Sequence, residues 1–145
     1  KSLPITDERM TRFWITLDHG VEFVLSLINL MIGGELFIPK SPSIKIIDLV
    51  KALDKNIKHH IIGIRPGEKL HEVLCPADSS RDTLEFKDYY LIKPSPYNID
   101  STKDQSNNYK INKSNEKGKF VKSNFVYDSG TNPHFLNIKE LKKLI

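Results

Sequence analysis

Apolar residues recur at helical spacing early in the chain, between Leu17 and Met31. These apolar positions are Leu17, Val21, Val24, Leu25 and Ile28. Residues three or four apart share one side of a helix, so this spacing gathers them on a single face. Thr16 is a suitable N-cap, and Gly33-Gly34 would end the helix. The pattern therefore predicts an amphipathic helix over residues 17–31.

Further helices are expected at three other places in the chain. Residues 48–53 carry apolar side chains at helical spacing and should turn them inward. Residues 70–74 favour a helical turn or a short helix. A helix over 138–145 is indicated more strongly, because Asn137 and Glu140 before it have the spacing of a capping box.

Strands are predicted where short apolar runs are bounded by turn residues. Residues 36–38 read as a short buried strand that ends at a proline, and 61–62 read as another. The runs 83–86 and 89–92 are rich in aromatic and branched side chains and flank Lys87-Asp88. This arrangement predicts a β-hairpin.

The character of the chain changes after Lys93, and this change divides it into three parts. Residues 1–93 hold most of the apolar side chains and form the first part. Residues 94–118 are rich in Pro, Asn, Ser, Lys and Asp and predict a polar loop or linker. Residues 119–145 regain apolar character and should add a C-terminal strand and helix.

Composition narrows the classes of partner and compartment. The 145 residues carry a formal net charge of +4, but the lysines are spread along the chain, so we expect no nucleic-acid partner. No run approaches the roughly 20 apolar residues needed to cross a bilayer, so we expect no membrane partner. Cys75 is the only cysteine and the histidines lack ligand spacing, which argues against a disulfide framework or a metal site. A reducing, cytoplasmic setting fits.

Candidate chemistry is concentrated in the stretch Ile64–Glu72, which reads IRPGEKLHE. Pro66-Gly67 predicts a tight turn, because Pro fixes one φ angle and Gly tolerates a positive one. Arg65 offers a planar fork of donors suited to a phosphate, and Glu68 can accept hydrogen bonds from sugar hydroxyls. The loop could therefore hold both ends of a nucleotide-sugar diphosphate. A plain ion pair on a surface loop is the alternative.

A second motif, LPITDERMTRFWIT over Leu3–Thr16, changes that balance. Together with GIRPGEKLHEVL it resembles the C-terminal part of the UDP-N-acetylglucosamine 4,6-dehydratases, which are extended short-chain dehydrogenase/reductases. The resemblance runs from Leu3 to Tyr90 and resumes weakly over Phe125–Leu136. It is strongest to the inverting branch, which begins pseudaminic acid synthesis for flagellin glycosylation, and the capsule-synthesis dehydratases share both motifs.

The resemblance implies a UDP-sugar site built from six residues. Arg12 should bind a UDP phosphate, Arg65 the diphosphate, and Glu68 the uridine ribose hydroxyls. Thr6 and Met10 would lie beside the uracil, where Thr6 could hydrogen-bond the ring and Met10 could pack on it. For Met10 ordinary core packing is the alternative, as stem packing on aromatic neighbours is for Arg12. Asn132 matches a polar patch of the family, and an N-cap or turn role is its alternative.

Two elements that the family needs are missing from the sequence. No glycine-rich turn of the dinucleotide-binding type is present. Tyr109 and Lys113 spell the family's Tyr-x-x-x-Lys, but in a polar stretch after the substrate motifs, so we interpret the match as coincidence. The chain also begins without Met. We therefore expect an α/β C-terminal fragment, the substrate-binding part of an extended short-chain dehydrogenase/reductase whose Rossmann half is absent.

The resemblance also implies what the longer protein does. It would be a dehydratase that acts on UDP-N-acetylglucosamine with NADP, the cofactor being bound by the missing N-terminal half. The full-length protein is expected to be a homo-oligomer, and the fragment alone is expected to be inactive. The alternative is a stand-alone UDP-sugar-binding module, or a truncated gene product, without catalysis.

Overall fold

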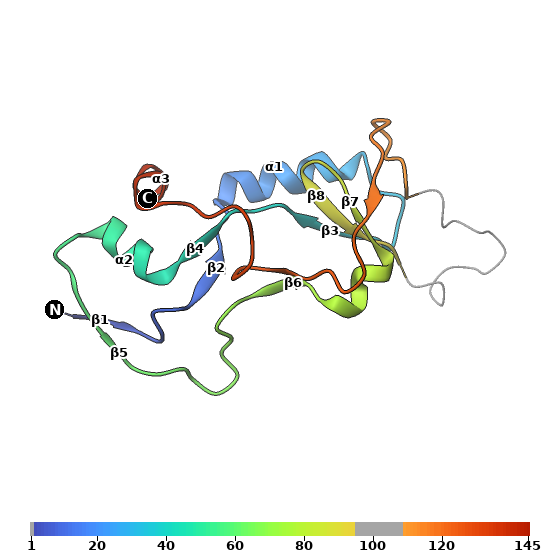
Figure 1. Ribbon diagram of the computed structural model, residues 1–145. Coiled ribbons are helices and arrows are strands. Elements are labelled where there is room, and N and C mark those ends of the chain that lie inside the picture. The colour runs from blue at the N-terminus through green and yellow to red at the C-terminus, as the bar shows by residue number, and fades with distance from the viewer. Residues whose placement is uncertain (1, 95–108) are drawn as a thin grey trace. The chain divides into compact units, whose positions relative to one another are not determined.

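The computed structural model describes residues 2–94 and 109–145, and their contacts form two compact units. Unit 1 comprises Lys1–Thr16, Ser41–Val73 and Tyr127–Ile145, and unit 2 comprises Leu17–Lys40 and Leu74–Val126. Both mix helices and strands (Figure 1), as the sequence predicted. The division proposed at residues 94 and 118 stays a prediction. Each unit draws on segments that are distant in sequence.

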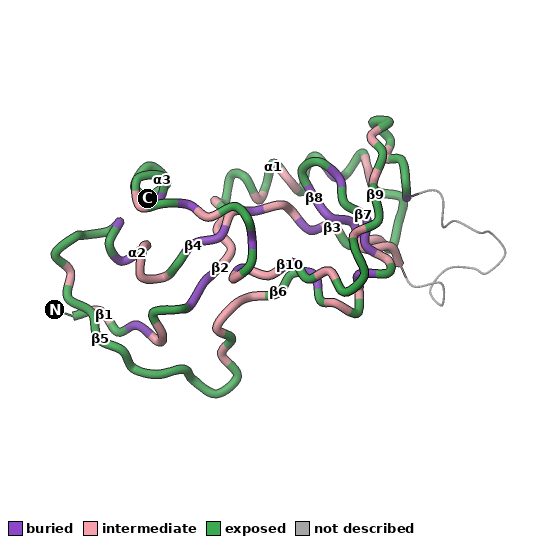
Figure 2. The backbone as a smooth tube through the Cα atoms, viewed as in Figure 1, coloured by how far each residue is buried: buried purple, intermediate pink, exposed green. Residues whose placement is uncertain are grey.

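Unit 1 contains two short strand pairs. β1 (Ser2–Ile5) pairs in parallel with β5 (Lys58–Ile61), which extends the strand expected at 61–62. β2 (Thr11–Phe13) pairs antiparallel with β4 (Ser43–Lys45). Figure 2 shows buried and half-buried residues along β2, buried residues over most of β4, and exposed residues along β5. The second pair is therefore the one that anchors the core of this unit.

Two helices complete the core of unit 1. α2 (Ile46–Leu53) and α3 (Ile138–Leu144) pack against each other, and both match the helices predicted from sequence. The capping box is confirmed, since the Asn137 side chain accepts from the amides of Lys139 and Glu140 while Glu140 accepts from Asn137. The buried residues of this cluster are Ile44, Ala52, Leu136 and Leu141.

Unit 2 is built on an antiparallel sheet in the order β3-β8-β7-β9. The bounds are β3 Leu36–Pro39, β7 Thr83–Glu85, β8 Tyr89–Ile92 and β9 Lys119–Phe120. The predicted hairpin is confirmed as β7–β8, closed by a hydrogen bond from the Phe86 amide to the Tyr89 carbonyl. The sheet residues Leu84, Tyr89 and Leu91 form the core together with Phe86, which directly follows β7, and Tyr109.

One predicted helix is wrong, and other short elements were not predicted. The segment 70–74 is not helical. Its last two residues belong to the strand β6 (Val73–Cys75). A 3-10 helix follows over Ala77–Asp82, and β10 spans Tyr127–Asp128. The backbone of 70–72 is instead used in long-range hydrogen bonds, since the Thr11 amide donates to the Leu70 carbonyl and the Ser129 amide to the Glu72 carbonyl.

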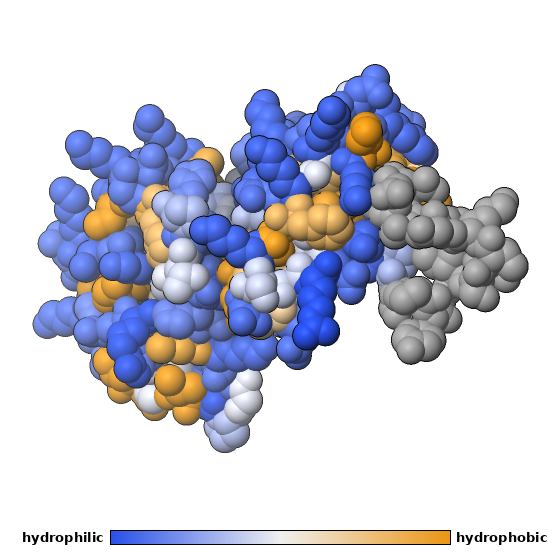
Figure 3. Space-filling view, turned by 45° about the vertical axis from the view of Figure 1, so that its right-hand side comes forward, coloured by the Kyte–Doolittle hydropathy of each residue, from blue (hydrophilic) through white to orange (hydrophobic). Residues whose placement is uncertain are grey.

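The first helix, α1 (Leu17–Ile28), is present but the predicted apolar face is not buried. The exposed face carries Leu17, Val21, Val24, Leu25 and Ile28, which are 50–82% exposed. The helix instead turns Phe23 and Leu27 inward, and Phe23 packs against the core of the sheet beside it (Figure 1). Apolar side chains also reach the surface elsewhere (Figure 3). Within the described residues, every helix is too short or too polar to cross a bilayer.

The predicted polar loop 94–118 is described only at its ends, because 95–108 lie outside the described residues. Its last part is folded. The Tyr109 side chain is 4% exposed and its hydroxyl donates to the Gly33 carbonyl at 3.1 Å, and Lys113 Nζ donates to the Met31 carbonyl at 2.8 Å. Burial raises the pKa of Tyr109. Both side chains of the Tyr-x-x-x-Lys match therefore serve the local fold.

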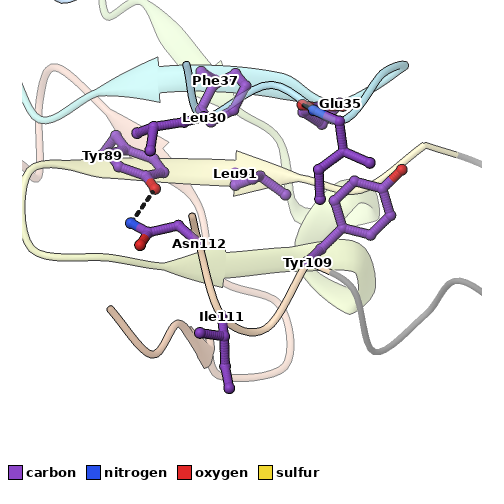
Figure 4. A pocket seen from close by; sticks show the side chains of 9 residues that line it. Leu30, Glu35, Phe37, Tyr89, Leu91, Tyr109, Ile111 and Asn112 are labelled. Carbon is purple, nitrogen blue, oxygen red and sulfur yellow. Dashed lines mark hydrogen bonds between the residues drawn. The ribbon is translucent and has the colours of Figure 1, made fainter. Parts of the chain in front are cut away.

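The small pocket beside Tyr109 has no room for a substrate (Figure 4). Leu30, Phe37, Tyr89 and Leu91 line it, and Asn112 Nδ2 donates to the Tyr89 hydroxyl at 3.0 Å. Its enclosed space is about 10 Å³, roughly the size of a single water site.

The exposed face of α1 leads to a test by denaturation and dye binding. Val24→Lys should leave the free energy of unfolding within about 0.5 kcal/mol and reduce binding of a hydrophobic dye, because Val24 is 60% exposed. The matched change Leu27→Ala should cost about 2–5 kcal/mol, because Leu27 is buried. Urea unfolding measures both. Equal destabilisation by the two changes would contradict the observed orientation of the helix.

Candidate functional site

The turn predicted at Pro66-Gly67 lies in unit 1, in the loop after β5. The Glu68 amide donates to the Arg65 carbonyl at 3.0 Å, and Gly67 has a φ of +79°. Pro at the second position and a positive φ at the third are the features of a type II turn. The sequence therefore folds this loop locally, and the turn sets Arg65 and Glu68 at its two ends.

The Glu68 carboxylate lies at the centre of the candidate site. Its Oε2 accepts from the Arg65 backbone amide at 3.2 Å, and its Oε1 accepts from the Thr6 hydroxyl at 3.4 Å. Arg12 Nη2 lies 4.0 Å from the same Oε1. Thr6, Arg12 and Glu68, which were predicted separately from two motifs, are thus brought together. The side chain of Glu68 is about one quarter exposed, so it is held but still reachable.

The Arg12 guanidinium is fixed by the backbone on one edge. Its Nη1 donates to the carbonyls of Thr11 at 2.6 Å and Leu70 at 3.2 Å. The Nε atom lies 3.4 Å from Glu72 Oε1. Because Arg12 sits on β2 and Leu70 on the loop, these bonds join the two motifs. The edge formed by Nε and Nη2 faces the carboxylates of Glu72 and Glu68, the kind of group that a guanidinium pairs with.

Arg65 differs from Arg12 in having an uncommitted charge. The residue is exposed, and among the described residues its guanidinium has no hydrogen-bond or ion-pair partner. The alternative considered from sequence was an Arg65–Glu68 ion pair. In the structure Glu68 bonds to the backbone amide of Arg65, and the guanidinium is left available.

Met10 and Asn132 occupy more internal positions than the other four predicted residues. Met10 is 4% exposed, and its Sδ accepts from Arg12 Nη2 at 3.1 Å, which suits a packing role that supports Arg12. Asn132 is 7% exposed, and its Nδ2 donates to the Ser41 carbonyl and the Ser43 hydroxyl, both at 2.9 Å. Those bonds suit the turn role that the sequence also allowed.

A buried network that the sequence did not reveal supports the site. Thr11 Oγ1 lies 2.7 Å from both His71 Nδ1 and Ser129 Oγ, and Ser129 Oγ accepts from the Glu72 amide at 2.9 Å. The His71 ring lies so close to Gly130 that a Cβ there would come within 2.7 Å of it. The one signal in sequence was the position of His71 and Glu72 inside the same motif as Arg65.

The turn after Ser129 is held by a carboxylate. Asp128 accepts from the amides of Gly130 and Thr131 and from the Thr131 hydroxyl. Burial raises the pKa of Asp128, but the hydrogen bonds from Thr131 and Gly130 and the nearby His71 outweigh it, so the pKa lies below its usual value of 3.8. The ionised carboxylate of Asp128 therefore stabilises the turn that positions Ser129.

The consecutive glycines at 33 and 34 do not form a loop of the kind that holds a dinucleotide pyrophosphate. Gly33 and Gly34 have positive φ angles, but they lead into β3, whereas a pyrophosphate loop leads into the N-terminus of a helix. No group of three or more His, Cys, Asp or Glu side chains within the described ranges could hold a metal ion. What the described residues bring together is the Arg12 guanidinium, the Glu68 and Glu72 carboxylates and the Thr6 hydroxyl.

Comparisons with known proteins show which family the chain resembles. Residues 1–94 match the family model described as polysaccharide biosynthesis protein. The chain is 53% identical over its whole length to a UDP-N-acetylglucosamine 4,6-dehydratase (inverting) of Campylobacter jejuni serotype O:2, and 52% identical to that of serotype O:23/36. It spans 42% of each relative, less than half of their length.

A solved structure shows the same fold. The X-ray structure of Pen from Bacillus thuringiensis is similar over 99% of this chain with a TM-score of 0.73 and 30% sequence identity. The chain corresponds to 40% of that protein. The likeness therefore extends across both units, although it leaves most of the larger protein unmatched.

The lowered pKa of Asp128 predicts a pH dependence of stability. A carboxylate with a depressed pKa stabilises the fold above its unfolded pKa, and the contribution is lost as pH falls through the folded pKa. Asp128→Asn should lower stability at pH 7 and flatten the loss of stability below pH 4. Asp78→Asn, at an exposed carboxylate outside this turn, is the control. Thermal unfolding between pH 2.5 and 7 measures both, and identical profiles for the two variants would refute the role of Asp128.

Proposed function

The chain belongs to the family of polysaccharide biosynthesis proteins, and on that premise we propose that it forms the UDP-sugar-binding part of a UDP-N-acetylglucosamine 4,6-dehydratase. The observation that carries the proposal is the convergence of Thr6, Arg12 and Glu68 beside the Arg65 turn. Two guanidinium groups and one carboxylate match a ligand that has a diphosphate and a ribose. The 53% identity to a dehydratase of that name supports the sugar.

In the proposed complex each side chain takes the part of the ligand that its chemistry suits. The Nε–Nη2 edge of Arg12 and the free fork of Arg65 would hold the diphosphate oxygens. Glu68 would accept hydrogen bonds from the ribose hydroxyls, and Thr6 would bond the uracil. Met10 is 4% exposed and bonds Arg12 through its sulfur, so it would support Arg12 more than it would contact the uracil. Asn132 would act on the ligand indirectly, through the turn that it holds.

We assign no catalytic group to the described residues. The reaction that the resemblance implies oxidises C4 of the sugar and removes water across C5 and C6, and NADP supplies the redox chemistry. That cofactor would be bound outside this chain, since the glycines described here do not fit its pyrophosphate. The contribution of this chain is to bind the nucleotide, orient the sugar and fix the diphosphate.

The proposal extends to the biological setting. The inverting reaction points to nucleotide-sugar synthesis for pseudaminic acid and flagellin glycosylation, with capsule synthesis as the related role. A cytoplasmic location suits a chain whose single cysteine, Cys75, is free and buried. The longer enzyme would act as a homo-oligomer without a nucleic-acid or membrane partner.

A UDP-sugar-binding module without catalysis is the second candidate. The bonding of Tyr109 and Lys113 within unit 2 leaves neither side chain for proton transfer, so the described residues offer binding groups without a catalytic pair, as this candidate requires. An assay for the keto-sugar product separates the two candidates. The 145 residues alone should bind UDP and form no product, while the longest native polypeptide that contains them should form product with NADP if the first candidate is correct.

Arg65→Ala should weaken UDP binding by about 10- to 150-fold, because a charge-assisted hydrogen bond contributes roughly 1.5–3 kcal/mol. Arg65→Lys should also lose affinity, since an ammonium group cannot reproduce the fork. Calorimetry on the native protein measures the dissociation constant. Arg81→Ala, at an exposed arginine of unit 2, is the matched control. If Arg65→Ala binds UDP like the parent protein, the turn is structural only.

Glu68 and Arg12 should be separable by two ligands. Glu68→Gln should weaken binding of UDP but matter much less for 2′,3′-dideoxy-UDP, because the analogue lacks the hydroxyls. Arg12→Ala should weaken both ligands similarly, and more at low salt, where charge attraction is least screened. Arg9→Ala is the control, because Arg9 already pairs with Asp7 at 2.8 Å. Equal losses for both ligands in Glu68→Gln would reassign Glu68 to shaping the turn.

A further inference from the structure

The guanidinium of Arg12 already has a partner at each of its three nitrogen atoms. Nη1 donates to two backbone carbonyls, and Nη2 lies near Met10 Sδ and Glu68. Nε lies 3.4 Å from Glu72 Oε1. A phosphate that binds Arg12 side-on needs the edge formed by Nε and Nη2. An anionic ligand therefore meets a site that holds an internal anion at the same place.

From this arrangement we infer that the Glu72 carboxylate competes with the ligand for Arg12. The diphosphate of a UDP-sugar must displace Glu72 in order to bind the Arg12 guanidinium. This inference rests on the proposed function, and it adds a residue that tunes affinity for the anionic part of the ligand. Glu72 would hold Arg12 in the ligand-free protein and leave the guanidinium when the phosphate arrives.

The backbone of Glu72 is held in place, which separates this pair from a chance contact on the surface. The Glu72 amide donates to Ser129 Oγ at 2.9 Å, and the Ser129 amide donates to the Glu72 carbonyl at 2.8 Å. Ser129 Oγ in turn bonds Thr11, the residue before Arg12, and both hydroxyl residues are buried. The fold thus fixes the backbone of Glu72, from which its side chain extends, relative to Arg12.

The carboxylate of Glu72, by contrast, is free to leave. Its side chain is 42% exposed, and within the described ranges Arg12 is its only ion-pair or hydrogen-bond partner. Glu68 lacks this freedom, because the Thr6 hydroxyl and the Arg65 amide both hold its carboxylate. Of the two negative charges beside Arg12, Glu72 is therefore the one that moves when a second anion is added.

Charge balance gives the direction of the effect. Glu68 and Glu72 together compensate Arg12, and a diphosphate brings further negative charge to the same edge. The diphosphate reaches this edge only by breaking the Arg12–Glu72 ion pair, and that costs more in a partly buried site, where water screens the charges less. Removing the charge of Glu72 while keeping its size should then strengthen binding of phosphate-bearing ligands.

The test is calorimetry of Glu72→Gln in the native protein with UDP and with uridine. UDP should bind about 2- to 5-fold more tightly, the scale of a partly exposed ion pair. Uridine, which has no phosphate, should bind as it does to the parent protein. In an Arg12→Ala background the Glu72→Gln change should have no effect on UDP, because the competition needs Arg12.

The control is Glu85→Gln, which breaks a comparable ion pair to Lys40 in unit 2 and should leave UDP binding unchanged. If the parent protein binds UDP and Arg12→Ala weakens it, the proposed function stands, and weaker or unchanged binding in Glu72→Gln then overturns the competitor role alone. If the parent protein binds no UDP, the proposed function itself fails. A gain with uridine as large as that with UDP would also overturn the inference, since it would not depend on phosphate.

Discussion

The candidate site depends on two buried hydroxyl groups, those of Thr11 and Ser129, that bond to each other across 118 residues of sequence. A buried hydroxyl without a partner costs about 1–3 kcal/mol, and these two are satisfied by each other together with His71 and the Glu72 amide. Through them β2, the end of the Arg65 loop and the segment after β10 are held in one arrangement. Each site residue lies on or next to one of these three segments, or forms a hydrogen bond with a residue that does.

This attachment explains why Arg12 has so little freedom. Its Nη1 bonds to carbonyls of β2 and of the loop, so the guanidinium plane is oriented before any ligand binds. A preorganised donor loses little side-chain entropy on binding, which favours affinity and a single ligand pose. The same rigidity lets one carboxylate, Glu68, serve the turn, Thr6 and Arg12 together.

Local signals in the sequence predicted the local structure well. The Pro66-Gly67 turn, the capping box at Asn137 and the hairpin around Lys87-Asp88 each depend on neighbours within a few residues, and all are present. Pairings across long separations were not predictable in this way. The roles of Ser129 and Thr11 follow only from the folded chain, because no spacing links residues so far apart.

The face of α1 shows a different limit. Helical periodicity indicates that an apolar stripe exists, but it does not say which surface covers the stripe, and here the unit buries Phe23 and Leu27 in its place. The candidate site shows the same limit for charge. Sequence motifs marked Arg12 and Glu68, whereas the role of Glu72 follows from a 3.4 Å approach that only the tertiary structure sets.

Arg12 and Arg65 both present a guanidinium, but in different surroundings, and the difference suggests separate roles in binding an anion. Arg12 is oriented but compensated by nearby carboxylates, so in the proposed complex it would add little long-range attraction and would mainly select the geometry of the ligand. Arg65 is exposed and, within the described part of the chain, uncompensated, so it can attract an anion from solution but must lose side-chain freedom to hold it. A diphosphate that bridges both would be attracted by the exposed charge of Arg65 and aligned by the oriented guanidinium of Arg12. The turn at Pro66-Gly67 makes this division possible, because it directs the Glu68 carboxylate to the Arg65 amide and leaves the guanidinium free.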